Sequence, residues 1–100
     1  MTLLSLFFAA VFFVNGVPHF VQGVSGNRFQ SPFASPPGVG ESSALVNVLW
    51  GAFNFLIGYL LFRYAGTFQV GLNLASLLFF GGGLLMAVVL ARHFGKVRGD

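Results

Sequence analysis

The sequence predicts an all-α membrane protein with three transmembrane helices. Hydrophobic residues make up 56% of the 100 residues and charged residues only 7%, which leaves too little polar surface for a soluble domain of this length. The charged residues also lie between long uncharged blocks rather than within them. Three such blocks are long enough for a helix across a hydrocarbon core of about 30 Å, which needs about 20 residues. We therefore expect residues 1–100 to form one integral membrane domain.

Residues 3–24 form the first predicted span, which has a polar stretch in its second half. Pro18 lacks the amide hydrogen that would bond to the carbonyl one turn earlier, and its ring crowds that carbonyl, so the sequence predicts a kink. Asn15, His19 and Gln22 are spaced at i, i+4 and i+7, which places them on one helical face. We expect this face to point at protein. A cleaved signal peptide is the alternative, but the segment lacks an early Lys or Arg and a small-x-small cleavage site.

The segment 25–43 is rich in Gly, Ser, Pro and Asn and is not expected to be helical. It is longer than the usual connector of about 2–8 residues between the helices of a bundle. Such a segment is either mobile or packed as a cap over the end of the bundle. Phe29 and Phe33 favour the packed cap, because a disordered linker gains nothing from aromatic side chains.

The second predicted span covers residues 44–64 and follows Glu41, Ser42 and Ser43. A Ser at this position caps the first turn of a helix, and the carboxylate favours the positive end of the helix dipole. Small and polar residues then recur at i, i+4, i+7 and i+11, namely Asn47, Gly51, Asn54 and Gly58. In lipid, small residues let helices approach closely and amides bond across the gap, so we expect this stripe to pack against another helix.

The third predicted span covers residues 68–91, and the short connection before it makes the second and third spans an antiparallel hairpin. Asn73, Ser76 and Gly83 lie on one face of this span, and we expect them to pack against a neighbouring helix. Residues 92–100 form a basic, polar tail, and this end of the chain is expected to fray.

The basic residues predict the orientation of the spans. Three spans would place Arg28, Arg92, Lys96 and Arg98 on one side of the membrane and Arg63 on the other. Positive charges favour the cytoplasmic side, so we expect a multi-pass protein of the cell membrane with its N-terminus outside and its C-terminus in the cytoplasm. The tail suits anionic lipid headgroups better than nucleic acid, so no nucleic-acid partner is expected.

This topology gathers several polar side chains at the cytoplasmic end, beneath the segment 25–43. The candidate ligand-binding residues there are Asn15, His19, Gln22, Asn47 and His93. Structural roles are the simpler interpretation: His19 would bond to a carbonyl freed by Pro18, and the Asn residues would hold helices together. Ionisable groups within a span nevertheless suggest a function, because placing them there is costly.

Catalytic and metal sites lack the residue patterns that they need. The sequence has no Cys, no paired carboxylates, no His-Glu-x-x-His helix and no phosphate-binding Gly loop, so we predict no catalytic or metal-binding residues and rank a membrane enzyme last. The leading hypothesis is a small accessory subunit or an oligomer, because each span carries a stripe that a partner membrane protein or a second copy could cover. The alternative is a binding protein or carrier for a lipid, a quinone or, less readily, a haem at the face formed by Asn15, His19 and Gln22. The sequence itself identifies no cofactor.

Overall fold

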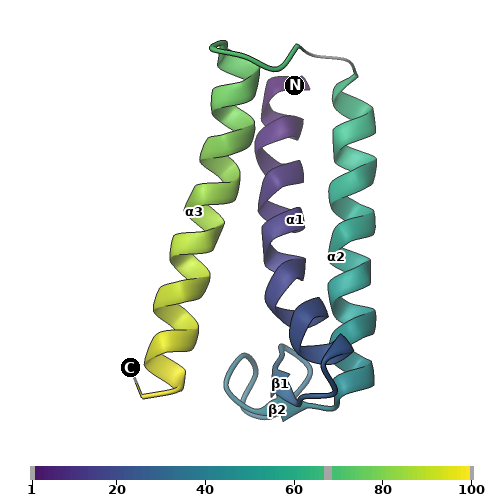
Figure 1. The fold of residues 1–100 in the computed structure, drawn as a ribbon, viewed down its shortest axis with the longest axis vertical. Helices are drawn as coiled ribbons and strands as arrows, with labels where there is room; N and C mark the ends of the chain where they lie inside the picture. Colours follow the sequence, from purple (N-terminus) through teal and green to yellow (C-terminus); the bar gives the residue numbers. More distant parts are fainter. Residues whose placement is uncertain (1, 67–68, 100) are drawn as a thin grey trace.

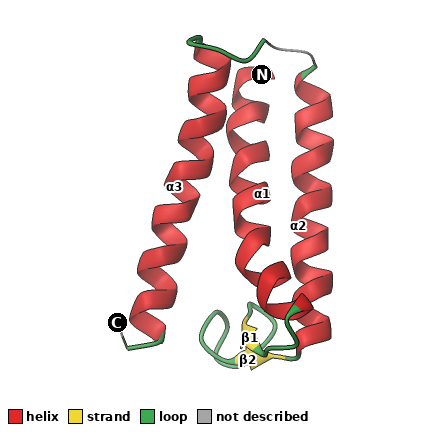
Figure 2. Ribbon diagram, viewed as in Figure 1, coloured by secondary structure: helices red, strands yellow, loops and turns green. Residues whose placement is uncertain are grey.

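The structure, a computed structural model, describes residues 2–66 and 69–99. Within these ranges the chain forms three helices and one two-stranded sheet. The elements are α1 (Thr2–Val24), β1 (Phe29–Gln30), β2 (Glu41–Ser42), α2 (Ala44–Ala65) and α3 (Leu74–Val97). The helices run side by side, and the sheet belongs to a folded segment across one end of the bundle (Figures 1 and 2). All three helices are long and apolar enough to cross a membrane, so this part of the sequence prediction is confirmed.

α1 occupies the centre of the bundle. It packs against both α2 and α3, whereas α2 and α3 make little contact with each other (Figure 1). The two later helices run antiparallel, and α1 lies between them (Figure 1). Pro18 lies within α1, and the helix continues past it to Val24, so the kink that Pro18 is expected to cause near Val14 and Asn15 stays a prediction.

A capping side chain precedes each of the two later helices. Ser43 Oγ accepts a hydrogen bond from the backbone N–H of Val46 (3.2 Å) at the start of α2. Asn73 Oδ1 accepts one from the backbone N–H of Ser76 (2.9 Å) at the start of α3. The structure thus places Asn73 and Ser76 in a helix cap, and not in a stripe between helices as the sequence suggested.

The bounds of α3 differ from those of the third predicted span. The helix begins at Leu74, because Asn73 supplies the cap, whereas the prediction began several residues earlier. Residue 68, where the prediction began, lies outside the described residues. The helix also continues beyond residue 91 to Val97, so most of the expected polar tail forms its last turns.

Glycines bring α1 and α2 into close contact. A Cβ atom on Gly51 would lie 2.9 Å from the carbonyl oxygen of Gly16, and one on Gly16 would lie 2.8 Å from the carbonyl oxygen of Gly51. A Cβ atom on Gly58 would lie 3.0 Å from the carbonyl oxygen of Ala9. No methyl group fits at such distances from a backbone atom, so the stripe of α2 faces α1 at the closest approach of the two helices.

α3 lies closest to α1 near its start and diverges from it toward the folded segment (Figure 1). A Cβ atom on Gly82 would clash with the backbone carbonyl of Phe7, so Gly82 marks the tightest contact. Gly83 also faces α1, where a Cβ atom would lie 3.4 Å from Val14 Cγ2. Only 6% of the apolar stretch of α3 is buried, so most of this helix faces outward.

The segment 25–43 folds into a cap over one end of the bundle (Figure 1). β1 and β2 pair in antiparallel register, with Phe29 opposite Ser42. The Ser42 hydroxyl lies 2.6 Å from that of Ser31, which joins the two sides of the cap a second time.

Phe29 is buried, and its ring packs against His19 of α1. Phe33 is more exposed, but its ring lies edge-to-face against Trp50 of α2, with the ring centroids 5.0 Å apart. Both aromatic residues therefore join the cap to the helices.

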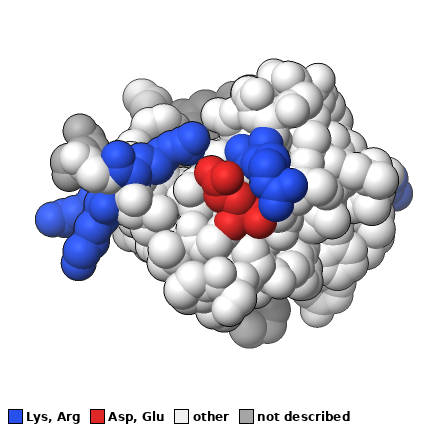
Figure 3. Space-filling view, turned by 90° about the horizontal axis from the view of Figure 1, so that it is seen from below, with Lys and Arg blue, Asp and Glu red and all other residues white. Residues whose placement is uncertain are grey.

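The capped end carries most of the charge. Arg28 Nη2 donates to the backbone oxygen of Glu41 (3.2 Å), and the Arg98 guanidinium lies 5.1 Å from the centre of the Phe29 ring. Figure 3 views this end and shows basic side chains on both sides of one acidic patch. Arg63 lies in the last turn of α2, at the opposite end of the bundle. The basic side chains are thus concentrated beside the cap.

Candidate functional site

Asn47 is the central side chain of the candidate site and is fully buried. Its Nδ2 atom lies within hydrogen-bond distance of three backbone oxygens, those of Phe29 (3.1 Å), Ser42 (3.3 Å) and Ser43 (3.1 Å). Its Oδ1 atom lies 2.9 Å from Nδ1 of His19. Because carbonyl oxygens only accept, the amide nitrogen must face them, and Nδ1 of His19 must carry the hydrogen that is donated to Oδ1.

His19 is buried on α1 among aromatic rings. The ring centroids of Phe29, Phe94 and Trp50 lie 5.5, 6.0 and 6.4 Å from that of His19, all in edge-to-face geometry. Because Nδ1 donates to Asn47, the other ring nitrogen, Nε2, is a hydrogen-bond acceptor. Nε2 has no hydrogen-bond partner among the described residues. The expected bond from His19 to a carbonyl freed by Pro18 is therefore replaced by a bond to α2.

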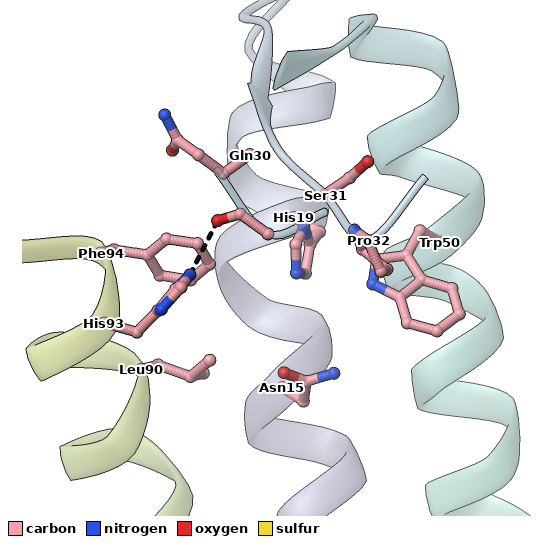
Figure 4. A pocket seen from close by; sticks show the side chains of 10 residues that line it. Asn15, His19, Gln30, Ser31, Pro32, Trp50, Leu90, His93 and Phe94 are labelled. Atoms are coloured by element: carbon pink, nitrogen blue, oxygen red, sulfur yellow. Dashed lines mark hydrogen bonds between the residues drawn. The ribbon is translucent and has the colours of Figure 1, made fainter. Parts of the chain in front are cut away.

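Asn15 lies one turn before His19, on the same side of α1 (Figure 4). Its Nδ2 atom donates to Oδ1 of Asn54 (2.8 Å), and Nδ2 of Asn54 donates in turn to the backbone oxygen of Trp50 (2.9 Å). These two bonds fix the orientation of both amides, so Oδ1 of Asn15 points away from α2 (Figure 4). This oxygen makes no hydrogen bond within the part of the chain that the structure describes.

A cavity of about 290 Å³ opens beside His19 and Asn15, between the helices and the cap. Its wall also contains Gln30, Trp50, His93 and Phe94 (Figure 4). The Oε1 atom of Gln30 is buried and has no hydrogen-bond partner among residues 2–66 and 69–99. The Gln30 amide points away from His19 and Asn15 (Figure 4), so the polar atoms beside the aromatic rings that lack a partner among the described residues are Nε2 of His19 and Oδ1 of Asn15.

His93 connects α3 to the cap. Its Nε2 atom lies 2.7 Å from the backbone oxygen of Gly38, and the dashed line in Figure 4 marks this contact. The carbonyl can only accept, so Nε2 carries the hydrogen and donates. The two imidazoles thus line one cavity, but they differ in burial and in tautomer: His19 is buried, whereas His93 is exposed.

The structure brings together three of the five predicted site residues, namely Asn15, His19 and His93, in one wall. Asn47 lies behind His19 and orients it. Gln22 lies outside the cavity, and its Oε1 atom accepts from Nδ2 of Asn27 (3.0 Å) at the start of the cap. The helical spacing predicted that Gln22 shares a face with Asn15 and His19. Because Gln22 lies near the end of α1, its side chain contacts the start of the cap instead of the cavity.

Sequence reasoning missed Gln30, Trp50 and Phe94 as members of the site. Trp50 had a usable signal, because it lies between the two Asn residues of the α2 stripe, at i+3 from Asn47 and i−4 from Asn54. Phe94 had none, since the sequence assigned it to a tail. Its place in the wall follows from the continuation of α3.

An apolar groove of about 540 Å³ adjoins the polar cavity between α1 and α3. Val14, Val17, Pro18 and Ala87 line it, together with Leu90 and Phe94. Leu90 and Phe94 also line the polar cavity, so the two spaces have a common wall. A mainly aromatic and aliphatic cavity with a few polar atoms in its wall therefore meets a wholly apolar groove at the capped end of the bundle.

The chemistry that this site supports is hydrogen bonding to a bound molecule. No serine, threonine or tyrosine hydroxyl of the described residues bonds to Nε2 of His19, and these residues contain no group of three or more His, Cys, Asp or Glu that could hold a metal ion. No protein-family model, curated protein or solved structure matches the chain. The function must therefore be inferred from the geometry of the site.

Proposed function

We propose that the protein binds a small amphipathic molecule at the capped end of the bundle. The polar group would occupy the cavity beside His19, and the apolar chain would lie in the groove between α1 and α3. The common wall of the two spaces, formed by Leu90 and Phe94, is the observation that carries this proposal. A molecule with one polar and one apolar end suits two adjoining spaces of this kind better than a wholly polar or wholly apolar one.

The proposal includes a membrane orientation. The three helices would cross the cell membrane with the N-terminus outside and the C-terminus in the cytoplasm. The length and apolar character of the helices support the crossing, and the basic side chains around the cap support the orientation. The groove would then open toward the cytoplasmic leaflet. A bend at Pro18, which lines the groove, would separate α1 from α3 at this end.

An accessory or self-associating role has weaker support. It depends on stripes that need a partner helix, and α1 already covers the stripe of Gly51, Asn54 and Gly58. The outward face of α3 suits lipid as well as protein. A haem between the two imidazoles would need a ring nitrogen of His93, and the bond from Nε2 to Gly38 leaves only Nδ1 for this purpose.

Filling the groove tests the proposed function. Ala87 is exposed and lines the groove, so Ala87→Phe should occupy this space without disturbing a helix contact. Val88→Phe is the matched control, because Val88 is the next exposed residue of α3 and lies outside the groove. Native mass spectrometry of protein extracted in mild detergent would measure the amphiphile that co-purifies.

We expect wild type and Val88→Phe to carry the same bound amphiphile. Ala87→Phe should carry about tenfold less, which corresponds to about 1.4 kcal/mol of lost binding free energy. Equal amounts on all three proteins would contradict ligand binding in the groove. If both variants lost the amphiphile to the same extent, the cause would be a general disturbance of α3, and this result would also contradict binding in the groove.

A further inference from the structure

We infer that the polar group held in the cavity is a neutral hydroxyl, an inference that rests on the proposed function. The unused hydrogen-bonding atoms of the wall determine this choice. His19 Nε2 and Asn15 Oδ1 are both acceptors, and each lacks a partner among the described residues. Neither atom can change its role, because Asn47 holds the tautomer of His19 and Asn54 holds the amide of Asn15.

The cavity wall also offers a donor. The indole N–H of Trp50 forms no hydrogen bond within residues 2–66 and 69–99, and Trp50 lines the cavity. Figure 4 shows the indole nitrogen on the side of the ring toward His19. The site therefore presents acceptors and a donor to one small space.

A hydroxyl has one O–H donor and two acceptor lone pairs, so it can pair with one of the two acceptors and with the donor at the same time. It can donate to His19 Nε2 and accept from the indole N–H of Trp50. A quinone carbonyl only accepts, so it would leave both wall acceptors unsatisfied, and an ammonium only donates, so it would leave the indole N–H unsatisfied. Unpaired buried polar groups are the main source of discrimination between ligands that differ by one hydroxyl.

The charges around the cavity favour a neutral group. No Asp, Glu, Lys or Arg of the described residues lines the cavity, so a phosphate or an ammonium there would be desolvated without a counter-charge. The Arg98 guanidinium lies over the ring of Phe29, which lines the groove and is not part of the cavity wall.

A direct comparison of ligands tests the inference in the wild-type protein. The probes are 1,2-dioleoylglycerol, which has one free hydroxyl, its 3-O-methyl ether, which cannot donate, and its 3-amino analogue, which carries an ammonium at pH 7. Native mass spectrometry of delipidated protein would give the dissociation constant of each. We expect the alcohol to bind about tenfold more tightly than the ether or the amine, the effect of about one lost hydrogen bond.

The outcomes separate the inference from the proposed function. If alcohol and ether bind equally and Ala87→Phe weakens both, the groove binds amphiphiles but water satisfies the polar wall, and the hydroxyl inference is overturned. If the amine binds best, the neutral character is overturned. If no probe binds and no co-purified amphiphile responds to Ala87→Phe, the proposed function fails as well.

The variant His19→Phe tests whether the imidazole of His19 causes the preference for the alcohol over the ether. His19→Phe keeps an aromatic ring against its neighbours but removes Nε2, so the ratio of ether to alcohol dissociation constants should fall from about ten to about one. Val88→Phe should keep the wild-type ratio. An unchanged ratio in folded His19→Phe would overturn the role of His19, and the wild-type comparison decides the inference if this variant does not fold.

Discussion

Asn47 joins the cap to the bundle and sets the tautomer of His19 at the same time. Its Nδ2 atom faces backbone oxygens of the cap and of the start of α2, and this leaves Oδ1 to accept from His19 Nδ1. Nε2 of His19 must then act as an acceptor toward the cavity. A residue outside the cavity wall therefore controls which hydrogen-bonding groups the wall offers.

Replacement of this amide should lower stability sharply. Asn47→Asp keeps the shape of the side chain but cannot donate to the backbone oxygens of Phe29 and Ser42. The Ser43 oxygen would keep only its bond from the backbone N–H of Asn47. We expect the free energy of unfolding to fall by about 3 kcal/mol, the upper range for a buried unsatisfied group. Thermal unfolding in mild detergent, followed by circular dichroism, would measure the change.

Asn73→Asp is the matched control, because the aspartate oxygen can still accept from the backbone N–H of Ser76 at the start of α3. A negative charge is also favourable at a helix N-terminus. Its free energy of unfolding should stay within about 0.5 kcal/mol of wild type. If both substitutions had the same small effect, the central role of Asn47 would be wrong.

At the scale of the helices, two consecutive glycines of α3 have opposite surroundings. A Cβ atom on Gly82 would clash with the backbone carbonyl of Phe7, whereas one on Gly81 would meet no atom within 4 Å. The contact of α3 with α1 therefore depends on one residue of the glycine run. The sequence predicted packing for Gly83 alone, and the direction of each glycine depends on how α3 is rotated against α1.

The two glycines give a matched pair of substitutions. Gly82→Ala should lower the free energy of unfolding by about 1–3 kcal/mol, because the opposing atom belongs to the backbone and cannot move aside. Gly81→Ala should raise it by up to about 1 kcal/mol, because alanine favours the helix. Unfolding of the two variants in the same detergent would compare them, and equal stabilities would contradict the packing of α3 on α1.

At the scale of the whole molecule, most of the basic side chains and the groove lie at the same end of the bundle. Basic side chains surround the cap, and the groove between α1 and α3 lies beside it. On this side a hydrogen bond from His93 Nε2 to the backbone oxygen of Gly38 joins α3 to the cap. In the orientation that we propose, an amphiphile in the cytoplasmic leaflet would reach the groove and the cavity from the same side of the membrane.

The orientation of the protein can be measured directly. A reporter fused after Asp100 should be active in the cytoplasm, and one fused before Leu3 should be active outside, because the basic side chains beside the cap favour the cytoplasmic face. Substituting glutamine for Arg92, Lys96 and Arg98 should weaken this preference and increase the fraction of inverted protein. An exported C-terminus in the unsubstituted chain would refute the proposed orientation.

The sequence by itself determined the features that depend on local spacing and composition. Three apolar helices follow from the long uncharged blocks, and the common face of Asn15 and His19 follows from the helical repeat. The α2 stripe was likewise visible as a packing surface, because its small and amide residues recur at helical spacing.

Only the tertiary structure decided which helix meets which stripe and what the polar atoms bond to. The bonds from His19 to Asn47 and from Asn15 to Asn54 join residues 28 and 39 positions apart, and no local pattern predicts such pairs. The central position of α1, and the contact between the cavity and the groove, also depend on how the three apolar helices pack. The helices have similar compositions, so a few close backbone contacts, such as that of Gly51 with Gly16, decide which helices pack together.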